Sequence, residues 1–165
     1  GGGLWASADT SLIARVKDDY DGAEPSGNAM AALALAELGR LTDQPRWSEE
    51  ASKILDGLGE RMRRLPQAVP HALLALERLS EPHARLILAG RGWEKLQAAA
   101  GQVYRPDVLI TRATEAHPSE FVRQLALNAK GAAAYLCEGQ SCQIPVGNGP
   151  ELIKKLRREQ TGVSP

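Results

Sequence analysis

The sequence predicts a mostly α-helical protein that ends in a small α/β unit. Alanine and leucine supply most of the apolar residues, and aromatic side chains make up only 4% of the 165 residues, a composition that favours helices over sheets. In the first half, apolar residues recur at spacings of three and four, the period of an α-helix. In the second half, short apolar runs bounded by proline or glycine alternate with helical segments. We therefore divide the chain into a helical region, 1–82, and an α/β region, 83–165.

An arm and a turn-rich loop are expected to lead into the first helix. Apolar and polar residues alternate over 12–16, which predicts a short strand or extended arm. The loop over 18–27 contains Asp-Gly and Pro-Ser-Gly, both strong turn sequences. Ser26 or Asn28 is expected to cap the helix by accepting a hydrogen bond from an N–H group of its first turn.

The first helix, predicted at about 28–41, is apolar on nearly every side. Glu37 is its only charged side chain before the last turn. A helix that is apolar all round is expected to be buried all round. This helix therefore needs more neighbours than the chain supplies.

Two further helices are predicted at about 48–65 and 71–79. Ser48 is a suitable N-cap for the first of them, and Pro70 suits the first turn of the second. The apolar stripe of the longer helix consists of Trp47, Ala51, Ile54, Leu55, Leu58, Met62 and Leu65.

The second half is predicted to hold a sheet of about three strands with helices between them. Strand–helix–strand spacing implies mainly parallel pairing through right-handed crossovers. The predicted strands are 84–89, 107–111 and 132–137, and the predicted helices are 93–100, 120–127 and 150–158.

Composition argues against several classes of partner. Lys and Arg together number 20, as do Asp and Glu, so net charge favours neither nucleic acid nor an anionic membrane. No apolar run approaches the ~20 residues of a membrane span, and no secretory leader is visible; a cytoplasmic location is the default expectation. No Walker loop, nucleophile elbow or zinc-protease motif occurs. We predict no metal and no cofactor.

The loop over 18–24 is the principal candidate site. Its four carboxylates precede a helix N-terminus that carries Ser26 and Asn28. Paired carboxylates, one protonated and one ionised, are what acid–base chemistry on sugars requires. The alternative is a solvated acidic loop followed by an ordinary helix cap.

Three weaker features each have a plain structural interpretation. Gly90-Arg91-Gly92 follows a strand as a phosphate-binding turn does, but Lys95 stands where a third glycine is needed, which favours an ordinary tight turn. Cys137 and Cys142 lack the spacing of a redox or zinc pair. One is expected to be buried at a strand end and the other to lie in a loop, although a reversible disulfide is the alternative. His71 either faces a cavity or lies at the surface near a helix start.

Four segments together resemble one protein family. They are YDGAEPSGNAMAALALAELGRLT at 20–42, PHAL at 70–73, ARLILAG at 84–90 and AAAYLCEGQSCQIPVGNGPELIKKLRR at 132–158. In this order they resemble the C-terminal third of the spermatogenesis-associated, thioredoxin-like proteins. The resemblance covers nearly the whole chain, and Pro25-Ser26-Gly27-Asn28 and the segment around the two cysteines are its most specific pieces.

This resemblance implies a fold and a place for the site. The family joins a thioredoxin-like domain to an (α/α) toroid of helical hairpins, like that of six-hairpin glycosidases and epimerases, and ends in an α/β appendage. The present chain then holds the last toroid helices and that appendage. Residues matching the family motif, including Tyr20, Asp21, Ser26 and Asn28, are expected near the toroid cavity. The family's Cys-x-x-Cys is absent, so redox activity is not carried over.

Two functions follow as hypotheses, and no reaction is predicted. In the first, the toroid binds or processes carbohydrate, with a small sugar as partner, Asp21 and Glu24 as acid–base candidates, and Ser26 and Asn28 binding hydroxyls. In the second, the region is a non-catalytic scaffold that serves the rest of the parent chain. With part of a toroid missing, apolar surface around Met30, Leu33 and Leu35 is exposed, and self-association is expected.

Overall fold

The computed structural model describes residues 2–80 and 84–160. The chain divides into two compact units, 1–81 and 82–165, and each is considered by itself. The boundary predicted at 82–83, and with it His83, lies outside the described residues. About half of the chain is helical, and the strands all lie in the second unit. No helix of the described residues combines the length and the apolar character that a membrane crossing requires.

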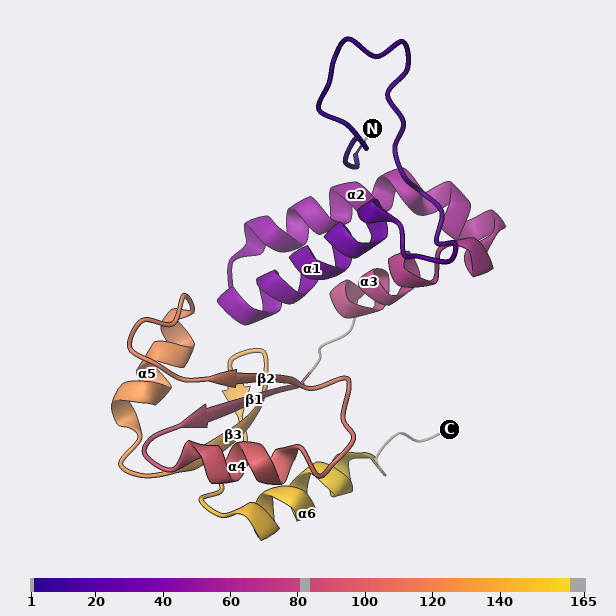
Figure 1. Cartoon of the computed structure of the whole chain (residues 1–165). Helices are drawn as coiled ribbons and strands as arrows, with labels where there is room; N and C mark the ends of the chain where they lie inside the picture. The colour runs from indigo at the N-terminus through magenta and orange to yellow at the C-terminus, as the bar shows by residue number, and fades with distance from the viewer. Residues whose placement is uncertain (1, 81–83, 161–165) are drawn as a thin grey trace. The chain divides into compact units, whose positions relative to one another are not determined.

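Three helices build the first unit: α1 (Gly27–Thr42), α2 (Pro45–Arg64) and α3 (Pro70–Ser80), with the short 3-10 helix η1 (Pro66–Ala68) between the last two. Each α-helix packs against the other two (Figure 1). Residues 2–26 contain no strand, so of the two alternatives predicted for 12–16 the strand is wrong and the arm stands. The core that the helices share consists of Ala29, Ala32, Ile54, Leu55, Leu58, Val69, Ala72 and Ala75.

The buried face of α1 consists of small residues. Ala29, Ala32, Ala36 and Gly39 are buried, and a Cβ added at Gly39 would lie 2.4 Å from Ser48 Oγ of α2. Small residues let two helix backbones approach closely, and the larger apolar side chains are left on the outer face. Met30 and Leu38 are exposed, in agreement with the prediction that this helix needs more neighbours than the chain supplies.

Helix α2 begins three residues earlier than predicted. Its N-cap is Gln44, and Pro45 occupies the first helical position, where a fixed φ and a missing N–H do no harm. Ser48 is not the cap; its carbonyl accepts a hydrogen bond from Ser52 Oγ one turn later, at 2.9 Å. Helix α3, predicted at about 71–79, begins at Pro70, which confirms the placement of Pro70 in its first turn.

The second unit is built on a four-stranded mixed sheet. Its strands are β1 (Ala84–Ala89), β2 (Leu109–Arg112), β3 (Ala133–Glu138) and β4 (Ser141–Cys142), in the order β2-β1-β3-β4. Only β1 and β2 are parallel, since β1 pairs with β3, and β3 with β4, in antiparallel register. The prediction of a mainly parallel sheet is therefore wrong.

The chain passes close to Gly90 on its way into β3. The chain enters β3 at the edge where β1 ends, because Ala133 pairs with Ala89. There Gly131 passes so close that a Cβ at Gly90 would lie 1.9 Å from the Gly131 carbonyl oxygen. With a φ of 76° at Gly90, only glycine fits this crossing without strain.

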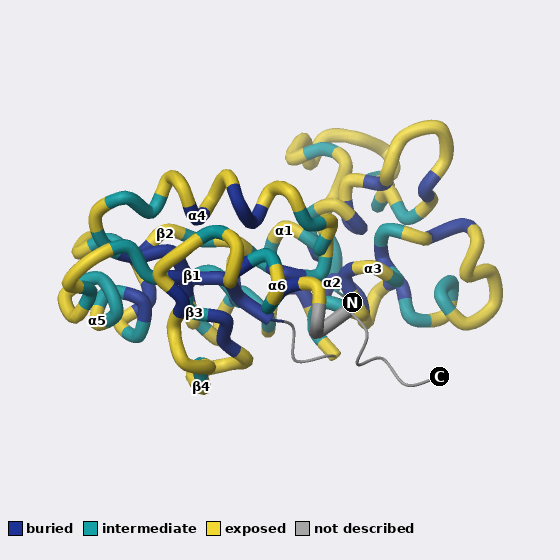
Figure 2. The backbone as a smooth tube through the Cα atoms, turned by 90° about the horizontal axis from the view of Figure 1, so that it is seen from below, coloured by how far each residue is buried: buried dark blue, intermediate teal, exposed yellow. Residues whose placement is uncertain are grey.

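Helices cover both faces of the sheet. Helices α4 (Trp93–Ala100) and α6 (Gly149–Gln160) pack together on one face, and α5 (Glu120–Asn128) covers the other. All six residues of β1 are buried, as Figure 2 shows. Among them, Arg85 directs its guanidinium to the Gly139 carbonyl oxygen at 2.7 Å.

Candidate functional site

Asp21 lies at the centre of the predicted acidic site, and both oxygens of its carboxylate accept hydrogen bonds from backbone N–H groups. Its Oδ1 accepts a hydrogen bond from the Ser26 N–H at 2.7 Å, and its Oδ2 accepts one from the His71 N–H at 2.8 Å. The Asp21 N–H donates to the Ala68 carbonyl at 2.8 Å. One residue therefore joins the loop to the starts of both α1 and α3.

The pKa of Asp21 reflects these opposing surroundings. Burial of the side chain raises the pKa, but hydrogen bonds from Ser26 and His71, with the charge that His71 carries when protonated, outweigh it and hold the pKa below its ordinary value of 3.8. An acid catalyst that works near neutral pH needs a raised pKa. Asp21 is therefore suited to remain ionised rather than to donate a proton.

His71 approaches the same carboxylate with its ring. Its Nδ1 lies 3.5 Å from Asp21 Oδ2, and the His71 side chain is 38% exposed. Nδ1 itself is buried and has no hydrogen-bond partner among the described residues. The ring thus rests on Asp21 at the start of α3, with part of its surface open to solvent.

The two preceding carboxylates also have structural partners. Asp18 Oδ2 accepts a hydrogen bond from the N–H of Gly27 at the start of α1, at 2.8 Å. Asp19 Oδ2 pairs with Arg61 Nη2 of α2, also at 2.8 Å. Carboxylates near a helix N-terminus are stabilised by its free N–H groups. The contacts of Asp18 and Asp19 therefore hold this part of the loop against α1 and α2.

Ser26 and Asn28 have separate tasks at the start of α1. Ser26 is the N-cap, and its Oγ accepts from the Ala29 N–H at 3.2 Å. The Asn28 amide accepts from the Leu4 N–H and donates to the carbonyls of Leu4 and Asp18 at 3.0 and 2.7 Å. Asn28 thus closes the base of the arm that loops away from the helices in Figure 1. No sequence pattern pointed to this role.

Tyr20 and Glu24 complete the set of predicted site residues, and both face solvent. Tyr20 is 56% exposed, with its ring beside Gly22. Glu24 is exposed as well. Asp21, Ser26 and Asn28 are therefore buried, and their side chains make hydrogen bonds to the backbone. Tyr20 and Glu24 are exposed to solvent.

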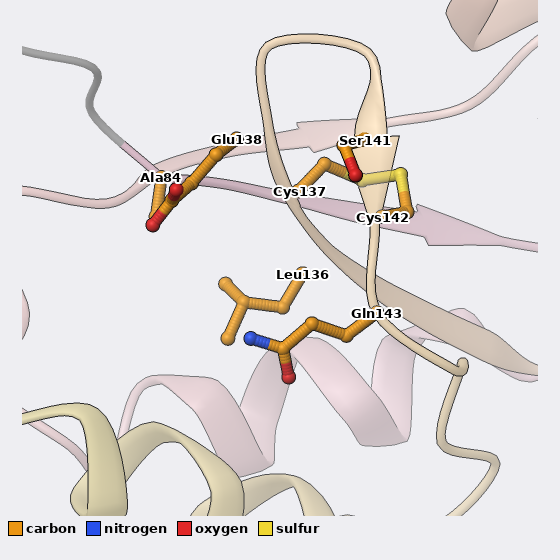
Figure 3. Close-up of a pocket in the computed structure, with 7 residues that line it drawn as sticks. All are labelled: Ala84, Leu136, Cys137, Glu138, Ser141, Cys142 and Gln143. Carbon is orange, nitrogen blue, oxygen red and sulfur yellow. A yellow bond between two sulfur atoms is a disulfide. The ribbon is translucent and has the colours of Figure 1, made fainter.

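Cys137 and Cys142 form a disulfide. They lie opposite each other on β3 and β4, because a two-residue turn, in which Gly139 has a φ of 57°, reverses the chain between the strands. Figure 3 shows the sulfur–sulfur bond between the two strands. The expected burial of one cysteine in a strand is confirmed for Cys137, but the expectation of a separate loop thiol is wrong.

The turn over Gly90–Gly92 is a tight connection. Both glycines have positive φ values, 76° and 89°, and Gly92 is the N-cap of α4. Among residues 2–80 and 84–160, no three His, Cys, Asp or Glu side chains gather as metal ligands would.

Several known proteins are similar to this chain, and three of them are described here. Spermatogenesis-associated protein 20 of Homo sapiens is 33% identical over 170 residues, covering 94% of this chain and 22% of the human protein. The Rattus norvegicus protein of the same name is 32% identical over 172 residues, 96% of this chain and 22% of its own length. An uncharacterized protein of Caenorhabditis elegans is 26% identical over 145 residues.

Neither of two other comparisons adds to this result, since no family model matches the chain and no solved structure does. The chain spans about a fifth of the length of the curated relatives it matches. It is homologous to spermatogenesis-associated protein 20 over that stretch.

Proposed function

We propose that the helical unit of this chain is a non-catalytic packing region of a longer protein, in which further helices of the same polypeptide cover the outer face of α1. The observation that carries the proposal is the arrangement of side chains on α1. Its inner face is built from alanine and glycine, while Met30 and Leu38, which are 44% and 38% exposed, lie outside.

The exposed side chains of α1 form one stripe. Met30, Ala34 and Leu38 are all exposed and are spaced by four residues, so they share one side of the helix. Burial of a methionine or leucine side chain stabilises a fold by about 1.5–3 kcal/mol. In α1 the small residues are buried and Met30 and Leu38 are exposed. The free energy of burying these two side chains is gained only when another surface covers them.

Two leucines of α3 add to the apolar surface of this unit. Leu74 and Leu76 are 39% and 41% exposed. Leu33 and Leu35, expected to be exposed together with Met30, are instead half-buried against the helical core. The outer stripe of α1 and the leucines of α3 are the surfaces that we assign to covering helices.

The size of the relatives favours helices of the same polypeptide as the occupant. The matched relatives are several times longer than the stretch that this chain covers. We infer that the three helices belong to an (α/α) toroid, completed by preceding hairpins. When this chain is isolated, we expect a second copy of the chain to cover the same surface of α1 and α3 in place of those helices.

The contacts of the acidic loop support a structural function for this region. The carboxylates of Asp18, Asp19 and Asp21 bind two helix starts and one arginine. Groups that hold helix termini in place have little freedom to bind a substrate. The loop therefore serves to fasten α1, α2 and α3 to one another.

Carbohydrate binding is a second candidate, favoured by the outward position of Tyr20 and Glu24. An exposed aromatic ring and a carboxylate are separated here by only three residues. Under this hypothesis, a panel of monosaccharides raises the melting temperature of the protein, and Tyr20→Ala or Glu24→Gln abolishes the shift. Asp21 is unsuitable for this test because its substitution disturbs the fold.

The packing proposal is tested by light scattering on variants of the outer stripe. Met30→Gln combined with Leu38→Gln is expected to keep the helical circular dichroism and to abolish self-association. Ile144→Gln is the matched control, since Ile144 is 85% exposed in the other unit; this variant keeps the association of the wild type. A wild-type chain that stays monomeric over the full range of accessible concentrations contradicts the proposal.

A further inference from the structure

We propose that the Cys137–Cys142 disulfide is a site of thiol–disulfide exchange, at which an external thiol attacks Cys142. Two features of the second unit support this inference: the position of the bond near a hairpin tip and the unequal burial of its two sulfur-bearing residues. The proposal is independent of the function proposed for the helical unit.

The disulfide lies close to the tip of the β3–β4 hairpin, at one edge of the sheet. Strand β4 has two residues and lies at the edge of the sheet. The four residues between the cysteines, 138–141, are all exposed. Exposed disulfides are more readily reduced than those enclosed in a core, so this bond is accessible to a reductant.

The two cysteines differ in their surroundings. Cys137 is 1% exposed and belongs to the cluster of Ile87 and Val122 beneath α5. Cys142 is half-buried and lies at the margin of that cluster. An attacking thiolate therefore reaches the sulfur of Cys142, and the sulfur of Cys137 is the leaving group.

A pocket of about 290 Å³ lies at the same hairpin. Both cysteines line it, together with Leu136, Ser141 and Gln143 (Figure 3). Exchange requires the attacking sulfur to approach a disulfide sulfur directly. Leu136 packs in the core on the α4 and α6 face of the sheet and Cys137 in the core beneath α5. The attacking thiol therefore approaches Cys142 from the edge of the sheet and not through this pocket.

The exchange consumes two thiols and yields one disulfide. The first thiolate bonds to Cys142 Sγ, the sulfur–sulfur bond breaks, and its electron pair passes to Cys137 Sγ, which takes up a proton from water. A second thiolate then attacks the sulfur of the reductant in this mixed disulfide and releases Cys142, which is protonated in turn. The protein gains two electrons and two protons, and a dithiol, or two molecules of a monothiol, is oxidised to its disulfide.

We expect the unit to keep its fold after reduction, because the hairpin has contacts that do not involve the sulfurs. One is the hydrogen bond from the Gln143 N–H to the Leu136 carbonyl at 3.0 Å. Another is the hydrogen bond from Arg85 to the Gly139 carbonyl. A reduced Cys137 remains a small apolar side chain in the core.

Reduced glutathione is a direct probe of the wild-type protein. The native protein is exposed briefly to millimolar reduced glutathione, quenched with acid and N-ethylmaleimide, and cut after Glu138, which separates the two cysteines. The expected product carries glutathione on Cys142 and the maleimide on Cys137. Glutathione on Cys137, or a bond that withstands glutathione until denaturant is added, overturns the proposal.

Two single-cysteine variants provide a second, independent readout. Cys137→Ala leaves the thiol of Cys142, and Cys142→Ala leaves the thiol of Cys137. In native protein, Cys142 is expected to react with a maleimide at least about tenfold faster than Cys137, as their exposure predicts. Equal rates, with both variants folded by circular dichroism, contradict the assignment of Cys142 as the attacked residue. If either variant fails to fold, the position of glutathione on the wild type decides alone.

Discussion

The Asp21 carboxylate accepts a hydrogen bond from the His71 backbone N–H at 2.8 Å and joins segments that lie 50 residues apart. Its other oxygen binds the Ser26 N–H at 2.7 Å. The residue that the sequence presents as a candidate acid is thereby a link between the acidic loop and two helix starts. The stability of the helical unit should depend on it.

Asp21→Asn should destabilise the helical unit by about 1–3 kcal/mol. Each carboxylate oxygen accepts one backbone N–H, and an amide offers an acceptor on one side only. Its NH2 group would therefore face a donor, either Ser26 or His71. Urea unfolding followed by circular dichroism measures the change. Glu24→Gln, an exposed change in the same loop, is the control and should stay within about 0.5 kcal/mol of the wild type; equal stability of both variants would count against the link.

The depressed pKa of Asp21 predicts a pH dependence of stability. Since the pKa in the folded state lies below the ordinary value of 3.8, ionised Asp21 stabilises the fold above that pH, and this contribution is lost as pH falls through the folded pKa. The stability difference between wild type and Asp21→Asn should therefore shrink as the pH is lowered below 3.8. Urea midpoints measured at several acidic pH values give the difference; a gap that widens on acidification refutes the prediction.

Asn28→Ala should release the arm without unfolding the helices. The amide holds the carbonyls of Leu4 and Asp18 and the N–H of Leu4, and the loss of these bonds favours local opening. Cleavage by trypsin after Arg15 should become at least roughly tenfold faster, because three hydrogen bonds of about 1 kcal/mol each are lost and a factor of ten corresponds to about 1.4 kcal/mol. Tyr20→Phe serves as the control and should leave the rate unchanged. An unchanged rate in Asn28→Ala would show that the arm is held elsewhere.

Gly90→Ala should destabilise the α/β unit by at least about 2 kcal/mol, because its positive φ and its contact with the Gly131 carbonyl both exclude a Cβ. Gly131→Ala is the matched control across the same crossing, since a Cβ there meets nothing within 4 Å. Thermal unfolding of both variants tests the pair. Equal melting temperatures would mean that β3 does not enter the sheet at this point.

Several elements were predictable because one local feature decides each of them. The strand at 84–89 and the helix at 93–100 are confirmed with their predicted limits, since an apolar run and a glycine-bounded turn are properties of the local sequence. The start of α2 was missed because Ser48 is a good cap by type, whereas Pro45 is a better first residue by backbone geometry.

The direction of β3 and the role of Asp21 could not be predicted from local patterns. A strand buried on both faces has the same apolar sequence whether its neighbour runs parallel or antiparallel. The partners of Asp21 are backbone N–H groups, which every residue except proline carries, so no residue type at position 71 signals the contact. The pairing of Cys137 with Cys142 depended likewise on a turn geometry that spacing alone does not reveal.

The central claim is that further helices of a longer polypeptide cover the outer face of α1, and oxidation of methionine tests it most directly. The chain has two methionines, of which Met30 is 44% exposed on α1 and Met62 lies half-buried in α2. Hydrogen peroxide is applied to the dilute chain and to the polypeptide encoded by the complete reading frame, with Met62 as internal reference. The proposal predicts that Met30 is oxidised quickly in the chain and is protected in the longer polypeptide. Equal oxidation of Met30 in both, or a reading frame that encodes nothing beyond this chain, would contradict it.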